Sequence, residues 1–136
     1  MRTLVAVGML MVAVPVWAAD SGVDQAYKTA RAAVKALADG SAQKAEAFEK
    51  LAQNEGHAQT EKNGSVSEAC ANVEAWCWQN AGWQWFLVGD FEKAVTDYEK
   101  ALACASIDAE CKRLAEKDMA TAKAKLAKET GGKATQ

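Results

Sequence analysis

The feature that most limits what this chain can fold into is the absence of proline after Pro15. Proline interrupts helices because it lacks a backbone N–H donor and its ring clashes with the preceding turn, so nothing downstream forbids long helices. Alanine, lysine and glutamate dominate the remaining sequence, and runs of β-branched residues are absent. Apolar residues also recur at three- and four-residue spacing, as on one face of a helix. The sequence therefore predicts an all-α fold.

Turn and capping residue types divide this pattern into about five helices. The boundary residues are Gly40, Ser41, Ser67, Gly89 and Ser106. They predict helices over 23–38, 41–52, 67–88, 91–102 and 108–128, a polar loop over 54–66 and a disordered tail over 129–136. No glycine or proline separates residues 90 and 129, so one long helix there is an alternative to a break at Ser106.

The first 18 residues have the order of a secretory signal peptide. Arg2 supplies a short positive region, residues 4–14 form an apolar run, and residues 16–18 form a cleavage pattern that predicts removal after Ala18, with Ala19 as the alternative. The run is shorter than the ~20 apolar residues that a membrane-spanning helix needs, so we expect cleavage and no membrane insertion. We therefore expect an exported protein of a bacterial periplasm, with a single helical domain over 19–128.

Four of the five tryptophans lie within ten positions of one another, inside a segment that resembles a tetratricopeptide repeat (TPR), a helix-turn-helix unit of about 34 residues. The residues that match its aromatic, small and turn positions are Trp78, Gly82, Trp85, Gly89-Asp90-Phe91, Ala94, Tyr98 and Ala101. The segment departs from the family at Ala81, where leucine is usual, and at Ser106, where proline is common. The resemblance implies antiparallel helix pairs capped by the last helix. Residues 23–54 are either a degenerate first repeat or a separate helix pair.

The tryptophans form two stripes, because residues seven apart nearly eclipse on a helix while residues two apart point in different directions. The resemblance places Trp78 and Trp85 in the packing of the repeat. It places the other stripe on the concave face that binds ligands in the family, with the candidate binding residues Trp76, Gln79, Trp83, Phe86 and Leu87. Packing of this second stripe against the helices of 23–54 is an equally weighted alternative.

The four cysteines form two pairs with seven-residue spacing, Cys70 with Cys77 and Cys104 with Cys111. In an oxidising compartment an even count indicates disulfides, but residues seven apart on one helix lie about 10.5 Å apart, too far for a bridge. Antiparallel helices bring together residues whose numbers have a constant sum. We therefore expect nested bridges, Cys70–Cys111 and Cys77–Cys104, which fit this rule better than crossed bridges and would staple a small core.

Patterns for catalysis are missing from the chain. His57, the only histidine, falls in the predicted loop, where we expect it to be solvated. No nucleophile motif, haem motif, phosphate-binding loop or zinc-binding spacing is present, so we expect no enzymatic activity, no metal and no cofactor. The formal net charge of −2 offers no basic excess for nucleic acid.

These observations favour an interaction module that binds a partner protein or peptide through an aromatic helix face. A carrier that holds an apolar small ligand between the second tryptophan stripe and the first helix pair is an alternative. A structural accessory subunit of an envelope complex is another. Nothing in the pattern names the partner or the oligomeric state.

Overall fold

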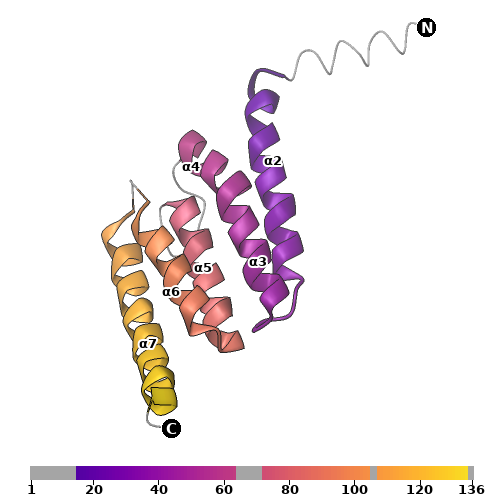
Figure 1. Ribbon diagram of the computed structural model, residues 1–136. Helices are drawn as coiled ribbons and strands as arrows, with labels where there is room; N and C mark the ends of the chain where they lie inside the picture. The colour runs from indigo at the N-terminus through magenta and orange to yellow at the C-terminus, as the bar shows by residue number, and fades with distance from the viewer. Residues whose placement is uncertain (1–14, 64–71, 105–106, 135–136) are drawn as a thin grey trace, which may run out of the picture.

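The computed structural model describes residues 15–63, 72–104 and 107–134 of the 136-residue chain. Every regular element within these residues is a helix, which confirms the predicted all-α fold. The elements, labelled as in Figure 1, are α2 (Pro15–Lys35), α3 (Ala42–Leu51), the π-helical turn η1 (Ala52–Gly56), α4 (His57–Asn63), α5 (Val73–Val88), α6 (Phe91–Leu102) and α7 (Ala109–Ala134). Of the predicted signal peptide only residues 15–18 are described, and they belong to α2. In this part of the chain, no helix has the length and apolar character needed to cross a membrane.

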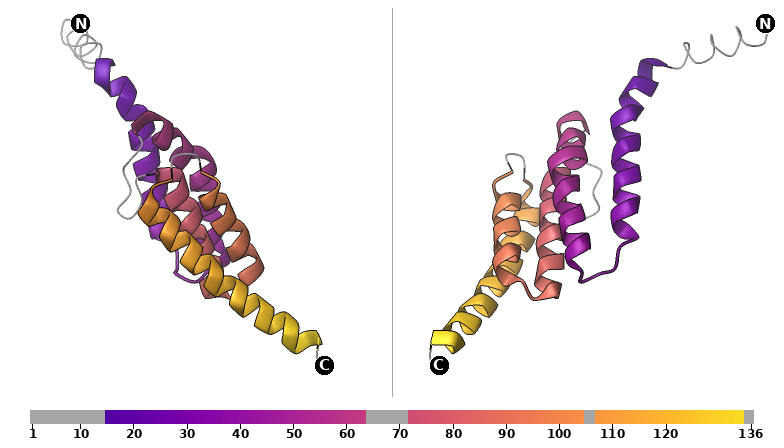
Figure 2. Two further views of the ribbon diagram at one scale, coloured as in Figure 1. Left: turned by 90° about the vertical axis from the view of Figure 1, so that its left-hand side faces the viewer. Right: turned by 45° about the vertical axis from the view of Figure 1, so that its right-hand side comes forward.

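The helices lie side by side in chain order and alternate in direction, from α2 at one edge to α7 at the other (Figures 1 and 2). Because η1 and α4 continue α3 without a break, the described residues form five helical segments. The most extensive contacts join α5 to α6, α3 to α5 and α6 to α7. Helix α5, which carries the clustered tryptophans, therefore lies at the centre of the stack and touches neighbours on several sides.

The turn between α2 and α3 is fastened to the central helix. Gly40 adopts a φ of +72°, which glycine tolerates because it has no Cβ, and Ser41 caps α3 by accepting the Lys44 N–H at 3.1 Å. The Gly40 N–H donates to Oε1 of Gln84 at 2.7 Å. Gln84 is a buried residue of α5, and its amide also donates to Asp39. The side-chain amide of Gln84 thus hydrogen-bonds to the turn between α2 and α3 and links this turn to α5.

The loop predicted over 54–66 is wrong for its described part, because residues 54–63 are helical in η1 and α4. Tertiary contacts explain the difference. A Cβ added at Gly56 would lie 3.1 Å from Cys77 Sγ, so this glycine lets the π-helical turn approach α5 closely. Gln59 is fully buried, and Thr60 Oγ1 accepts the Glu74 N–H at 2.8 Å. A polar segment therefore becomes helical because α5 supplies its packing partners.

The turn between α5 and α6 follows the prediction. Gly89 ends α5 with a φ of +97° and donates its N–H to Phe86 O at 3.1 Å. The Asp90 N–H reaches back to Trp85 O at 3.0 Å, which completes a Schellman-type helix end. Asp90 then caps α6 by accepting the Lys93 N–H at 3.1 Å. These local bonds set the antiparallel pairing of the two helices.

Other helix boundaries differ from the prediction. Helix α5 begins at Val73, where the side chain of Asn72 accepts the Ala75 N–H at 2.9 Å, and the expected cap Ser67 lies outside the described residues. Helix α6 ends at Leu102 and α7 begins at Ala109, so a single helix over 90–129 is excluded. Helix α7 runs on to Ala134, through most of the expected disordered tail, although this stretch contains two glycines.

The core is built around α5, and Trp78 and Trp85 are buried in it, as predicted. Trp85 belongs to a cluster with Ala94 and Tyr98 of α6. Helices α5 and α6 approach each other closely at Gly82, since a Cβ there would lie 2.8 Å from Cε1 of the buried Tyr98. The small residue at this crossing lets two aromatic helices pack tightly.

The predicted Cys77–Cys104 bridge is not formed in the structure, where both residues are free thiols. Cys77 is fully buried and Cys104 packs against the same core cluster. Burial raises the pKa of each thiol to about 12, because the charged thiolate would be poorly solvated there. The other predicted bridge involves Cys70, which lies outside the described residues, and Cys111, which is buried.

Candidate functional site

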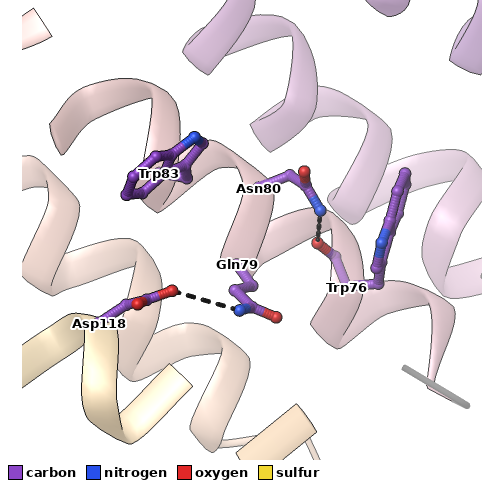
Figure 3. A pocket seen from close by; sticks show the side chains of 5 residues that line it. All are labelled: Trp76, Gln79, Asn80, Trp83 and Asp118. Atoms are coloured by element: carbon purple, nitrogen blue, oxygen red, sulfur yellow. Dashed lines mark hydrogen bonds between the residues drawn. The ribbon is translucent and has the colours of Figure 1, made fainter. Parts of the chain in front are cut away.

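Three of the five predicted binding residues line one pocket of about 170 Å³ on the central helix. They are Trp76, Gln79 and Trp83, joined by Asn80 of the same helix and by Asp118 of α7 (Figure 3). We call this site the Trp83 pocket. Its walls come from α5 and α7, and α6 lies between these two helices in the stack (Figure 1).

Trp76 belongs mostly to the core, although it is also one of the residues that line the pocket. Only 8 % of the residue is exposed. Its ring packs edge-on against Phe48 of α3, with centroids 6.0 Å apart, and the Arg31 guanidinium of α2 lies 4.7 Å from the ring centroid. For this residue the alternative of packing against the first helix pair is confirmed.

Trp83 has the opposite character, because 42 % of the residue is exposed. Its ring stacks on Phe86, with centroids 5.5 Å apart and an interplanar angle of 7°, and Phe86 packs edge-on against Phe91 at 5.2 Å. The row Trp83–Phe86–Phe91 holds the indole in place while leaving much of it in contact with solvent. From sequence spacing alone, Trp76 and Trp83 are expected to lie on the same side of the helix. Their tertiary neighbours bury Trp76 and leave Trp83 exposed.

Leu87 and Val88 extend the exposed apolar surface beyond Trp83 to the end of α5. Leu87 lies beside the turn between α2 and α3, where a Cβ added at Gly40 would lie 3.5 Å from Leu87 Cβ. Phe86 is half-buried under Trp83 and so supports the surface more than it contributes to it. Of the five predicted residues, Trp83 and Leu87 are thus the most accessible.

Polar groups form the rest of the Trp83 pocket. Asn80 Nδ2 donates to the Trp76 carbonyl at 2.8 Å, and Gln79 Nε2 donates to Asp118 Oδ2 at 3.5 Å (Figure 3). The second of these bonds is long and therefore weak. Sequence reasoning missed Asp118, because it lies on a different helix and no local pattern connects it to the tryptophans.

His57 is exposed, as the sequence predicts, but it lies in helix α4 and not in a loop, and it pairs with Glu74. Its Nδ1 lies 2.8 Å from Glu74 Oε1, and its Nε2 lies 3.3 Å from Glu61 Oε1. The hydrogen bond and charge of Glu74 raise the pKa of His57 above its usual value, and Glu61 adds a smaller effect.

We expect the NMR titration midpoint of His57 to lie above the ordinary value of about 6.5 and to fall in Glu74→Gln. The fall in Glu61→Gln should be smaller. Because the pKa is raised, this contact between α4 and α5 stabilises the fold below the unfolded-state pKa and is lost as the pH rises through the folded-state value. A midpoint that is the same in wild type and Glu74→Gln would contradict the pairing.

A second pocket, of about 200 Å³, brings acidic side chains together between α3, α5 and α6. Asp97 of α6 is buried there beside Glu49 of α3, whose Oε2 accepts the Trp85 indole N–H at 2.9 Å. Burial, together with the neighbouring Glu49 carboxylate, raises the pKa of Asp97 to about 8. We therefore expect the pair to hold one proton at neutral pH.

Within residues 15–63, 72–104 and 107–134, no group of three His, Cys, Asp or Glu side chains is placed to hold a metal ion. Comparisons of the chain with protein-family models, with curated proteins and with solved structures found no match. The site is therefore interpreted from its own geometry.

Proposed function

We propose that this protein is an exported, TPR-like module that binds a partner protein or peptide through the face of α5 around Trp83. The observation that carries the proposal is the exposed indole of Trp83, fixed by Phe86 and set in a pocket with polar walls. Large aromatic side chains with few rotatable bonds are typical anchors of protein interfaces. The exposed Leu87 and Val88 add apolar surface beside this anchor.

The proposed mechanism is binding to a preorganised surface. Because the aromatic row already holds the indole, little side-chain entropy is lost when a partner covers it. The partner gains by removing apolar area of Trp83, Leu87 and Val88 from water, at about 25 cal/mol per Å². Polar groups of Gln79, Asn80 and Asp118 then determine which partner groups fit beside the indole.

We further propose that oxidation after export staples the stack through Cys70–Cys111 and Cys77–Cys104. Cys77 and Cys111 belong to one core cluster, and Cys104 packs against it, so three of the four cysteines already lie in the same part of the core. The nested pairing is preferred over the crossed one because its residue numbers have the constant sum expected for antiparallel helices. Each bridge would add about 2–4 kcal/mol to stability by restricting the unfolded chain. Peptide mapping of the secreted protein without reduction tests the scheme, and a Cys70–Cys104 fragment would reject it.

The alternative of a small-ligand carrier receives less support from the Trp83 pocket. Its volume of about 170 Å³ is well below the range of about 300–1,000 Å³ that is usual for small-molecule sites. Trp76, which would form the wall facing the first helix pair, is already packed against Phe48 and Arg31. A pocket of this size suits one side chain of a polypeptide better than a whole apolar ligand.

The proposal is tested by selecting peptides from a displayed random library on the oxidised protein and measuring their affinity for Trp83→Ala. We expect a loss of about tenfold or more, because hot-spot aromatics typically contribute this much. Glu116→Ala, which changes an exposed residue of α7, is the matched control and should bind as the wild type does. Circular dichroism must show that all variants are folded. Selected peptides that bind wild type and Trp83→Ala equally would contradict the proposal.

A further inference from the structure

The four tryptophans of α5 differ in whether a cationic side chain lies over the ring. Three of them carry a cation of the protein over the ring: Arg31 lies 4.7 Å from the centroid of Trp76, Lys100 4.7 Å from Trp78 and Lys93 4.5 Å from Trp85. No such contact to Trp83 occurs among the described residues. Trp83 instead stacks on Phe86, and 42 % of it is exposed. Because Phe86 covers one face of the indole, we expect a cation to approach from the opposite face.

The Trp83 pocket also contains a carboxylate. Asp118 lines the same pocket from α7 and is half-buried. Within the described part of the chain its side chain forms no ion pair, and it accepts a long hydrogen bond from Gln79 Nε2 at 3.5 Å. A carboxylate that is further buried by a partner requires a strong donor, because desolvation without one is costly.

We propose that the Trp83 pocket receives a lysine or arginine side chain of the partner polypeptide, stacked on the indole of Trp83 and paired with Asp118. This inference rests on the proposed function and specifies the chemistry of the partner. The negative ring face and the carboxylate both attract a cation, and Asp118 repels an acidic side chain. The pocket volume of about 170 Å³ suits a single side chain, and the exposed Leu87 and Val88 lie on the same helix for neighbouring residues of the peptide.

The test uses three small probes and the indole N–H signal of Trp83 in NMR spectra of the ¹⁵N-labelled full-length protein. The probes are Nα-acetyl-arginine amide, its uncharged analogue Nα-acetyl-citrulline amide, and Nα-acetyl-leucine amide. We expect the arginine probe to shift the Trp83 signal saturably and to bind at least about threefold more tightly than citrulline, the size of an exposed cation–π and ion-pair contribution. Added salt should weaken the arginine probe selectively, because screening reduces its attraction to Asp118.

Two charge variants locate the interaction. Asp118→Asn should remove the preference for arginine over citrulline while leaving the fold intact, because the residue is only half-buried. Glu116→Gln removes the same charge from an exposed position of α7 and should leave the preference unchanged. The assignment of the Trp83 signal is made with Trp83→Phe.

The outcomes separate the two proposals. Equal binding of arginine and citrulline, or an arginine preference that survives in Asp118→Asn, overturns the cation assignment. If the leucine probe still shifts the Trp83 signal in that case, the proposed interaction face stands without it. If no probe shifts the signal, both the cation assignment and the accessible anchor are contradicted.

Discussion

Replacing Gly82 by alanine is expected to lower the free energy of unfolding by about 2 kcal/mol, because overpacking a well-filled core typically costs 1–3 kcal/mol or more. The new Cβ would lie 2.8 Å from Cε1 and 2.9 Å from Cδ1 of Tyr98. Tyr98 is fully buried, so we expect its neighbours to restrict movement of its ring. The higher helix propensity of alanine offsets up to about 1 kcal/mol of the cost. Chemical denaturation of the two proteins in the same redox state measures the difference.

Gly131→Ala is the matched control for this substitution. Gly131 also lies within a helix, but a Cβ there would meet no atom within 4 Å. The control should therefore be neutral or slightly stabilising, since only the propensity term acts. Similar losses at both glycines would contradict the explanation by contact with Tyr98.

Asp97→Asn is expected to stabilise the protein at pH 8 by about 2–4 kcal/mol. Each unit of pKa shift corresponds to about 1.4 kcal/mol, and we expect only part of the full shift to appear as a change in stability. Burial and Glu49 raise the pKa of Asp97 to about 8, from a usual value near 3.8. The asparagine amide keeps the shape of the side chain and can donate to the Glu49 carboxylate without being ionised. Glu46, Lys93 and Lys100 also line this pocket and remain in place.

The pH dependence follows from the direction of this shift. Between about pH 4 and pH 8 the unfolded chain releases the Asp97 proton while the folded chain keeps it, so the free energy of unfolding falls as the pH rises. Below this range both states are protonated, and above it both are ionised. Asp97→Asn should remove this slope, and Glu99→Gln, on the exposed side of α6, should retain it. An unchanged slope in Asp97→Asn would contradict the assignment.

Local signals predicted part of the architecture. Helix α6 has the predicted bounds, since Asp90 caps it and its apolar residues repeat with the helical period. The end of α5 was also predictable, because Gly89 adopts a conformation that other residues avoid. These features depend on neighbours along the chain, so the sequence alone carries them.

The region from Asn54 to Asn63 shows where local signals fail. Its polar residues and glycine predict a loop, whereas contacts to α5 make it helical. Its fully buried Gln59 could not be foreseen, because burial there depends on the helices that pack around it. The same holds for the pairing of His57 with Glu74, because the two residues lie 17 positions apart in the sequence and on different helices.

The sequence by itself determined the helical class, the turn at Gly89, the burial of Trp78 and Trp85, and a second tryptophan stripe on α5. The tertiary structure alone decided that Trp76 is covered by Arg31 and Phe48 while Trp83 stays exposed beside Asp118. The physical reason is that helical period sets the direction of a side chain from its own backbone. What that side chain meets is supplied by α2, α3 and α7, helices distant in the sequence, and their placement depends on the packing of the whole stack.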